Sequence, residues 1–141
     1  MNVIEINGLP LPEALCSAIE EGRWAPPGDE LQLAQVFTEK PQEPSFYTLE
    51  YMKAENHRWP DVESRLPMYL GSPDEASPPG DIDPTMSILI GDLGYDMPFA
   101  LDFRPSRAEP RVIYLTLQNG RWITVASTVE ILLSRLGLDQ A

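Results

Sequence analysis

The chain carries a single histidine, His57, and a single cysteine, Cys16, which limits the reactive chemistry open to it. This composition excludes a two-histidine zinc site, a zinc finger and an HExxH motif. A nucleophile activated by histidine would have to use His57, and Cys16 is the only thiol it could activate. Both residues have simpler roles: Cys16 falls on an expected helix as a small hydrophobe, and His57 falls at the end of another helix. A small hydrolase using Cys16 or His57 is therefore the third of three functional hypotheses.

Two short carboxylate clusters have the residue types of a calcium site. Asp92 and Asp96 form one cluster, and Asp81 and Asp83 form the other. Neither has the twelve-residue spacing and terminal glutamate of an EF-hand. Asp92 lies in a glycine-rich turn, where we expect its carboxylate to bond the local backbone. We therefore expect no metal and no cofactor, and no nucleotide-binding or GxSxG motif occurs. The sequence favours a protein that is not an enzyme.

Acidic residues dominate the first two thirds of the chain. The net charge is −12, and residues 1–90 hold 16 acidic and 5 basic residues, a net of −11. Such a field repels nucleic acid and anionic membranes and attracts basic partners. Solubility alone would also account for it. The charge thus argues against nucleic-acid and membrane binding without naming a partner.

Length and composition predict one folded domain. The 141 residues are 43% hydrophobic, enough for one core, and we expect a single domain over residues 1–141. No apolar run reaches membrane-span length, and no secretory signal is visible, so we expect a cytoplasmic protein. A lone cysteine fits a reducing compartment.

Short apolar runs separated by Gly, Pro and Asn predict an antiparallel sheet of four to six strands from the C-terminal half of the chain, and four runs are clear. They cover residues 87–92, 98–104, 110–115 and 122–126. Alternation places Phe99 and Leu101 on an apolar face. The same alternation places Tyr114 and Trp122 on the opposite face with Asp102 and Arg104. We expect that face to be core, with Asp102 and Arg104 as an ion pair at its edge.

The last helix is expected to cover the sheet. Val129, Leu132, Leu133 and Leu136 form one stripe at helical spacing. Ser127 and Glu130 have the spacing of a capping box, and Gly137 followed by Leu138 predicts a Schellman stop.

The N-terminal part predicts three shorter helices. One begins near Pro12 and ends near Gly22, a second follows Asp29 and ends near Phe37, and a third follows Thr48 and ends near Asn56 or His57. Residues 72–85 hold four prolines and four acids, and we expect them to form a loop with almost nothing to bury.

The order of these C-terminal elements resembles the SMI1/KNR4 (SUKH) family over roughly the last third of the chain. The matching pieces are Ile-Gly-Asp-Leu-Gly (90–94), Pro-Phe-Ala-Leu-Asp-Phe-Arg (98–104), Pro-Arg-Val-Ile-Tyr-Leu (110–115), Trp-Ile-Thr-Val-Ala-Ser (122–127) and a Leu-rich helix ending in Leu-Gly-Leu (136–138). The resemblance implies an α+β fold, an antiparallel meander packed against helices. It also implies a non-enzymatic protein-binding role, often that of a bacterial immunity protein of a polymorphic toxin system.

Our leading hypothesis is that the protein neutralises a cognate basic toxin, for example a nuclease, by occluding it with an acidic surface. Charge and expected exposure select Asp74, Glu75, Asp81 and Asp83 as its partner-binding residues. The alternative is a scaffold or regulatory adaptor of the same fold without a toxin partner.

Overall fold

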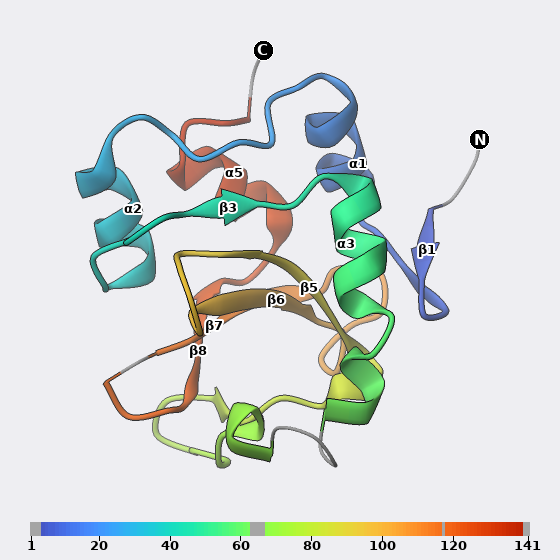
Figure 1. Ribbon diagram of the computed structural model, residues 1–141, viewed down its shortest axis with the longest axis vertical. Coiled ribbons are helices and arrows are strands. Elements are labelled where there is room, and N and C mark those ends of the chain that lie inside the picture. Colours follow the sequence, from blue (N-terminus) through green and yellow to red (C-terminus); the bar gives the residue numbers. More distant parts are fainter. Residues whose placement is uncertain (1–3, 63–66, 117, 140–141) are drawn as a thin grey trace.

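A six-stranded antiparallel sheet forms the centre of the computed structural model, which describes residues 4–62, 67–116 and 118–139 (Figure 1). Its strand order is β3-β5-β6-β7-β8-β4. The strands are β3 (Ser45–Phe46), β4 (Pro79–Gly80), β5 (Ser87–Asp92), β6 (Pro98–Asp102), β7 (Arg111–Leu115) and β8 (Trp122–Ala126). Consecutive strands from β5 to β8 are neighbours, so the predicted meander and the α+β fold class are confirmed.

The remaining elements are short helices and one small hairpin. The α-helices are α1 (Glu13–Glu20), α2 (Glu30–Phe37), α3 (Leu49–Asn56) and α5 (Val129–Arg135). The 3-10 helices are η1 (Trp59–Asp61), η2 (Pro67–Leu70) and η3 (Pro84–Met86), and β1 (Glu5–Ile6) pairs with β2 (Leu9–Pro10). None of the helices in the described part of the chain has the length and apolar character that a membrane span requires.

The helix caps predicted from the sequence are present at α2 and α3. The Asp29 carboxylate accepts a hydrogen bond from Leu31 N, and the Thr48 hydroxyl accepts one from Tyr51 N. Each bond satisfies a backbone donor that has no partner within its own helix. The helices therefore begin where the sequence predicts.

The first face of the sheet carries the aromatic core. Register pairs Phe99 with Tyr114, so both side chains lie on this face, and Phe37 of α2 contacts both rings at centroid distances of 4.9 and 5.4 Å. Helix α5 contacts β7 and β8. The assignment of Tyr114 to the opposite face is therefore wrong. Alternation within one strand separates its two faces, but it does not show which of them lies on the same side of the sheet as a given face of the next strand. The prediction that Tyr114 is core is confirmed, since it is fully buried.

The second face is covered by the 3-10 segments. Trp122 is fully buried there, 6.4 Å from the ring of Trp59 on η1, and its indole Nε1 donates to the carbonyl of Tyr69 at 2.7 Å. Asp102 lies on this face too, paired in register with Arg111. This packing fixes η1 and η2 against the sheet and so places the residues they carry.

The last helix has a different start and the predicted stop. Its N-cap is Thr128, whose hydroxyl accepts from Ile131 N, so the predicted capping box at Ser127 is wrong by one residue. The stop is confirmed: Gly137 has a φ of +71°, and Leu138 N donates to the carbonyl of Leu133 at 2.8 Å.

The acidic proline-rich stretch is more ordered than a loop. Its Pro79 and Gly80 form β4, the outer strand beside β8, and Ile82 is buried in the core. The expectation that residues 72–85 bury almost nothing is therefore wrong. Gly80 has a φ of +76°, and an added Cβ would lie 2.2 Å from the carbonyl of Ser72. This close approach needs glycine, a requirement that composition does not reveal.

Candidate functional site

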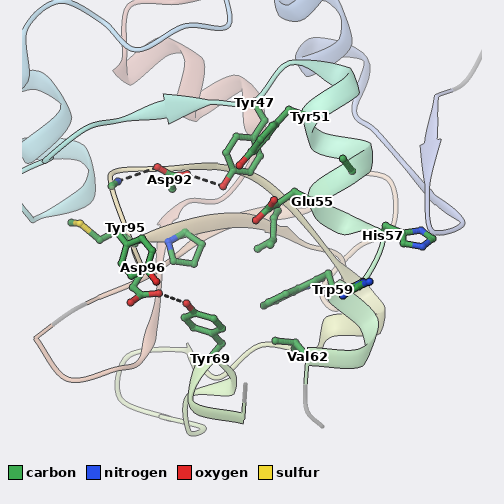
Figure 2. Close-up of a pocket in the computed structure, with 16 residues that line it drawn as sticks. Tyr47, Tyr51, Glu55, His57, Trp59, Val62, Tyr69, Asp92, Tyr95 and Asp96 are labelled. Carbon is green, nitrogen blue, oxygen red and sulfur yellow. Dashed lines mark hydrogen bonds between the residues drawn. The ribbon is translucent and has the colours of Figure 1, made fainter. Parts of the chain in front are cut away.

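A pocket of about 480 Å³ opens between α3, the η1 and η2 segments and the turn from β5 to β6 (Figure 2). Sixteen residues line it, among them four tyrosines and three carboxylates. Pockets of this size with a few convergent polar groups are the usual form of binding sites. We therefore treat it as the candidate functional site.

One face of α3 supplies one wall. Tyr51, Ala54 and Glu55 recur at helical spacing and line the pocket, and Arg58 lines it just beyond the end of the helix. The other side of the helix carries the buried Met52 and Asn56 toward the sheet. The helix thus divides into an anchoring side and a pocket side.

Tyr47 and Asp92 form the upper wall of the pocket. The Tyr47 hydroxyl donates to Asp92 Oδ2 at 2.8 Å, and Asp92 Oδ1 accepts from Gly94 N at 3.1 Å. The bond from Gly94 confirms that Asp92 bonds its local backbone, as expected. Burial raises the pKa of Asp92, and the two hydrogen bonds only partly oppose that effect. Burial, followed by the Asp92 carboxylate, raises the pKa of Tyr47, so its hydroxyl stays protonated at neutral pH.

The turn between β5 and β6 presents two further pocket residues. It is held by Leu93 and Met97, which are buried and bonded to each other through Leu93 N and the Met97 carbonyl at 3.0 Å. Between them Tyr95 is 88% exposed, and Asp96 has a φ of +60°. The turn therefore holds an aromatic side chain out in solvent at the rim of the pocket.

Tyr69 of η2 closes the pocket on the side facing the turn. Its hydroxyl donates to Asp96 Oδ1, as Figure 2 shows. Burial, followed by this hydrogen bond, raises the pKa of Tyr69 to about 12. Two tyrosine–aspartate pairs thus face the same cavity from different elements.

The charge of the pocket is negative. Among the described lining residues, the charged ones are Glu55, Asp92, Asp96 and Arg58, a net charge of −2 when His57 is counted as neutral. The negative charge of Glu55 raises the pKa of Tyr51, whose ring packs edge-on against Tyr47 at a centroid distance of 4.7 Å. A cation would therefore meet both carboxylates and aromatic faces here.

The four acidic residues selected from sequence lie elsewhere, and most of them are engaged within the protein. Asp74, Glu75 and Asp81 border a shallow depression of about 440 Å³ that also includes Arg104 and Arg111. Asp74 pairs with Arg121 at 3.1 Å, and Asp81 pairs with Arg104 at 3.0 Å. Asp83 is not on this depression: it caps η3, accepting hydrogen bonds from Thr85 N and Oγ1. Of the four, Glu75 is exposed on the surface.

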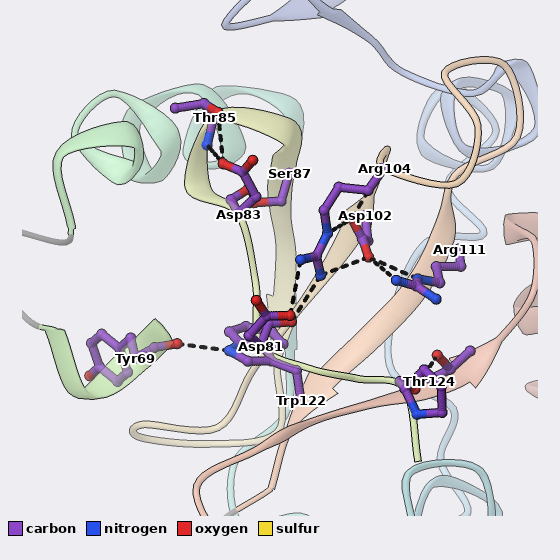
Figure 3. Close-up of polar contacts among 11 residues, drawn as sticks. Tyr69, Asp81, Asp83, Thr85, Ser87, Asp102, Arg104, Arg111, Trp122 and Thr124 are labelled. Carbon is purple, nitrogen blue, oxygen red and sulfur yellow. Dashed lines mark hydrogen bonds and ion pairs between the residues drawn. The ribbon is translucent and has the colours of Figure 1, made fainter. Parts of the chain in front are cut away.

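The ion pair predicted between Asp102 and Arg104 is confirmed, and it belongs to a larger network (Figure 3). Asp102 is fully buried and accepts hydrogen bonds from Arg104 and Arg111, while Arg104 also reaches the Asp81 carboxylate and carbonyl. Burial alone would raise the pKa of Asp102, but the hydrogen bonds from Arg104 and Arg111 outweigh burial and lower it. The network fastens the segment that precedes β5 to the sheet.

Cys16 and His57 are not brought together in a reactive arrangement by the pocket. Cys16 lies on α1 and is not one of the lining residues; burial raises the pKa of its thiol. His57 lies at the rim, and Figure 2 shows its ring turned away from the tyrosines. Within residues 4–62, 67–116 and 118–139, no group of three or more His, Cys, Asp or Glu side chains is placed to hold a metal ion.

Comparison with known proteins gives no match: no family model, no curated protein and no solved structure resembles the chain at a significant level.

The pocket contains residues that sequence reasoning did not select. Tyr51 and Glu55 had a signal, because they share one face of a helix whose other face is buried. Arg58 lies beyond the end of that helix. Tyr69 had no such signal, since its approach to Asp96 depends on how η2 packs against the turn. The place of Tyr95 at the rim likewise depends on the shape of that turn.

Proposed function

We propose that this protein is a non-enzymatic binding domain that recognises a basic protein partner at the pocket. The observation that carries this proposal is the combination of three carboxylates inside the pocket with a tyrosine 88% exposed at its rim. Exposed aromatic residues beside a pocket are typical of binding hot spots, and the carboxylates attract and orient basic partners.

The pocket is preferred to the acidic segment as the binding surface. The carboxylates of Asp74 and Asp81 are already paired with arginines of the same chain, and Asp83 is used as a helix cap. Such carboxylates would have to exchange an internal partner for an external one. Asp92 and Asp96 accept hydrogen bonds from neutral tyrosines, so their negative charges are not neutralised by those bonds.

Binding is preferred to catalysis because none of the described pocket residues is arranged as an activated nucleophile. The raised pKa values of Tyr47 and Tyr69 keep both phenols protonated, and the His57 ring faces away from them. If the protein were instead a hydrolase that uses Cys16 or His57, replacing both residues together should abolish the biological activity. An unchanged activity would eliminate this alternative.

Within this proposal, neutralisation of a toxin is the leading role, and it rests on the resemblance to the SMI1/KNR4 family together with the net charge of −12. The mechanism is occlusion, in which the acidic domain covers the basic site of the toxin. A regulatory adaptor with no toxic partner remains the alternative.

Affinity capture from the native cells, at low and high salt, tests the proposal. Three baits are compared: the unaltered protein, Tyr95→Ala and Glu75→Ala. We expect one basic partner that is released by salt, lost with Tyr95→Ala and retained with Glu75→Ala. Loss with Glu75→Ala alone would move the interface to the acidic segment.

The nature of the captured protein decides between the two roles. A partner that is toxic when expressed alone, and harmless when expressed with this protein, supports neutralisation. Several non-toxic cellular proteins would support the adaptor.

A further inference from the structure

Three hydrogen-bond donors on the pocket walls are engaged within the protein. The hydroxyls of Tyr47 and Tyr69 donate to Asp92 and Asp96, and the indole Nε1 of Trp59 donates to Ser87 Oγ at 2.9 Å. Each of these groups has only one proton to donate. A ligand that enters between these three groups finds their protons already donated.

The acceptors, by contrast, retain capacity. A carboxylate has about four lone-pair sites, whereas Asp92 takes two described hydrogen bonds, from Tyr47 and Gly94. The two phenol oxygens also keep their acceptor lone pairs after donating. These free acceptor sites favour a ligand that donates hydrogen bonds.

The aromatic rings of the pocket indicate which kind of cationic group fits best. A guanidinium is planar, carries five donors and no acceptor, and stacks on aromatic rings, whereas an ammonium is a compact and strongly hydrated charge. The pocket offers tyrosine rings beside its carboxylates, and its volume of about 480 Å³ admits a long side chain together with the backbone that carries it. Among the lining residues that the structure describes, Arg58 opposes a cation.

We propose that the pocket binds the guanidinium group of an arginine side chain presented by the partner. The inference rests on the proposed function and deepens it, since it assigns the anchor that a basic partner would insert. Asp92 and Asp96 receive the guanidinium N–H groups, and the rings of Tyr51 and Tyr95 border it.

The test uses the intact chain and three small probes followed by ¹H–¹⁵N NMR: N-acetyl-arginine-N-methylamide, its lysine counterpart and its citrulline counterpart. Citrulline has nearly the shape of arginine without the charge. We expect saturable shifts at Gly94, Tyr95 and the Trp59 indole with the arginine probe, weaker binding of the lysine probe and no response to citrulline.

Matched variants locate the site. Asp96→Asn removes one charge and keeps the backbone, because Asn tolerates the positive φ of this position. We expect it to weaken arginine binding by about tenfold. Glu75→Gln removes the same charge outside the pocket and should leave the affinity within about twofold. Arg58→Gln should strengthen binding.

Three results would overturn the inference: no saturable shift up to the solubility limit of the arginine probe, equal weakening by Asp96→Asn and Glu75→Gln, or a lysine probe that binds as tightly as arginine. None of these results decides the capture experiment. A partner that is lost with Tyr95→Ala would still support the proposed function.

Discussion

The side-chain amide of Asn56 pairs with the backbone of Leu89 as a neighbouring strand would. Asn56 Nδ2 donates to the Leu89 carbonyl at 2.8 Å, and Leu89 N donates to Asn56 Oδ1 at 2.8 Å. Asn56 is fully buried at the end of α3, and Nδ2 also donates to the carbonyl of Met52. The pair joins the helix that carries Tyr51 and Glu55 to the strand that ends at Asp92.

Replacing Asn56 by Asp should destabilise the protein strongly. The carboxylate keeps the size of the amide but cannot donate to the carbonyls of Leu89 and Met52, so two buried acceptors lose their partner beside a buried charge. We expect a loss of about 3–5 kcal/mol in the free energy of unfolding, measured by urea denaturation. The exposed amide Gln35 gives the control, and Gln35→Glu should change stability by less than about 0.5 kcal/mol. A small loss for Asn56→Asp would contradict the assigned hydrogen bonds.

Gly91 and Gly28 provide a matched pair of glycine substitutions. A Cβ at Gly91 would lie 2.4 Å from Phe99 Cζ and 2.8 Å from the carbonyl of Ser45, whereas a Cβ at Gly28 meets nothing within 4 Å. Gly91→Ala should therefore cost about 1–3 kcal/mol of stability, because the Phe99 ring and β3 must both move. Gly28→Ala should leave stability nearly unchanged or raise it slightly. Equal effects in thermal or urea unfolding would show that Phe99 does not pack over Gly91.

The Asp102 network should make stability depend on pH in the acid range. The folded protein lowers the pKa of Asp102 below its unfolded value of about 3.9, so its contribution is present above that value. The contribution is lost as the pH falls toward the folded pKa. Asp102→Asn should thus destabilise the protein at pH 7, and the difference from the unaltered protein should shrink at pH 3. Urea unfolding across this range measures it, and a difference that grows toward low pH would contradict the sign.

Binding of the arginine probe should weaken on mild acidification. The pKa of Asp92 is raised by burial, so this carboxylate takes up a proton at a higher pH than a free aspartate, whose pKa is about 3.9. Protonation removes one charge from the pocket and one hydrogen-bond acceptor from the guanidinium. NMR titrations of the probe between pH 7 and pH 4, with the Asp92 carboxyl carbon followed in parallel, should show affinity falling as Asp92 titrates. A constant affinity would exclude Asp92 from the contact.

The sequence predicted the elements well wherever a local signal was sufficient. Asp29 and Thr48 are helix caps because their side chains bond backbone N–H groups two or three residues away. Gly137 ends the last helix because the left-handed conformation favours glycine. Ser127 was mistaken for the cap instead of Thr128, because adjacent hydroxyl residues carry the same local signal.

The face of Tyr114 and the site itself required information that no local pattern holds. Pairing of Phe99 with Tyr114 is set by the register between strands, and the approach of Tyr69 to Asp96 is set by packing of η2 against Trp122. Charge in the sequence likewise did not show that Arg104 and Arg121 already hold Asp81 and Asp74. These arginines lie far along the chain from the acidic segment, so the local sequence does not show that its carboxylates are paired.

Both edge strands of the central sheet are poor templates for pairing with a strand of another molecule. The outer strands β3 and β4 each span two residues, and β4 begins with Pro79, which has no N–H to offer. Beside β3, the edge of β5 at Leu89 is occupied by the Asn56 amide. Short, proline-bearing or covered edges resist the strand-to-strand stacking from which fibrils grow. Pairing of a second copy along either outer strand of this sheet is therefore disfavoured.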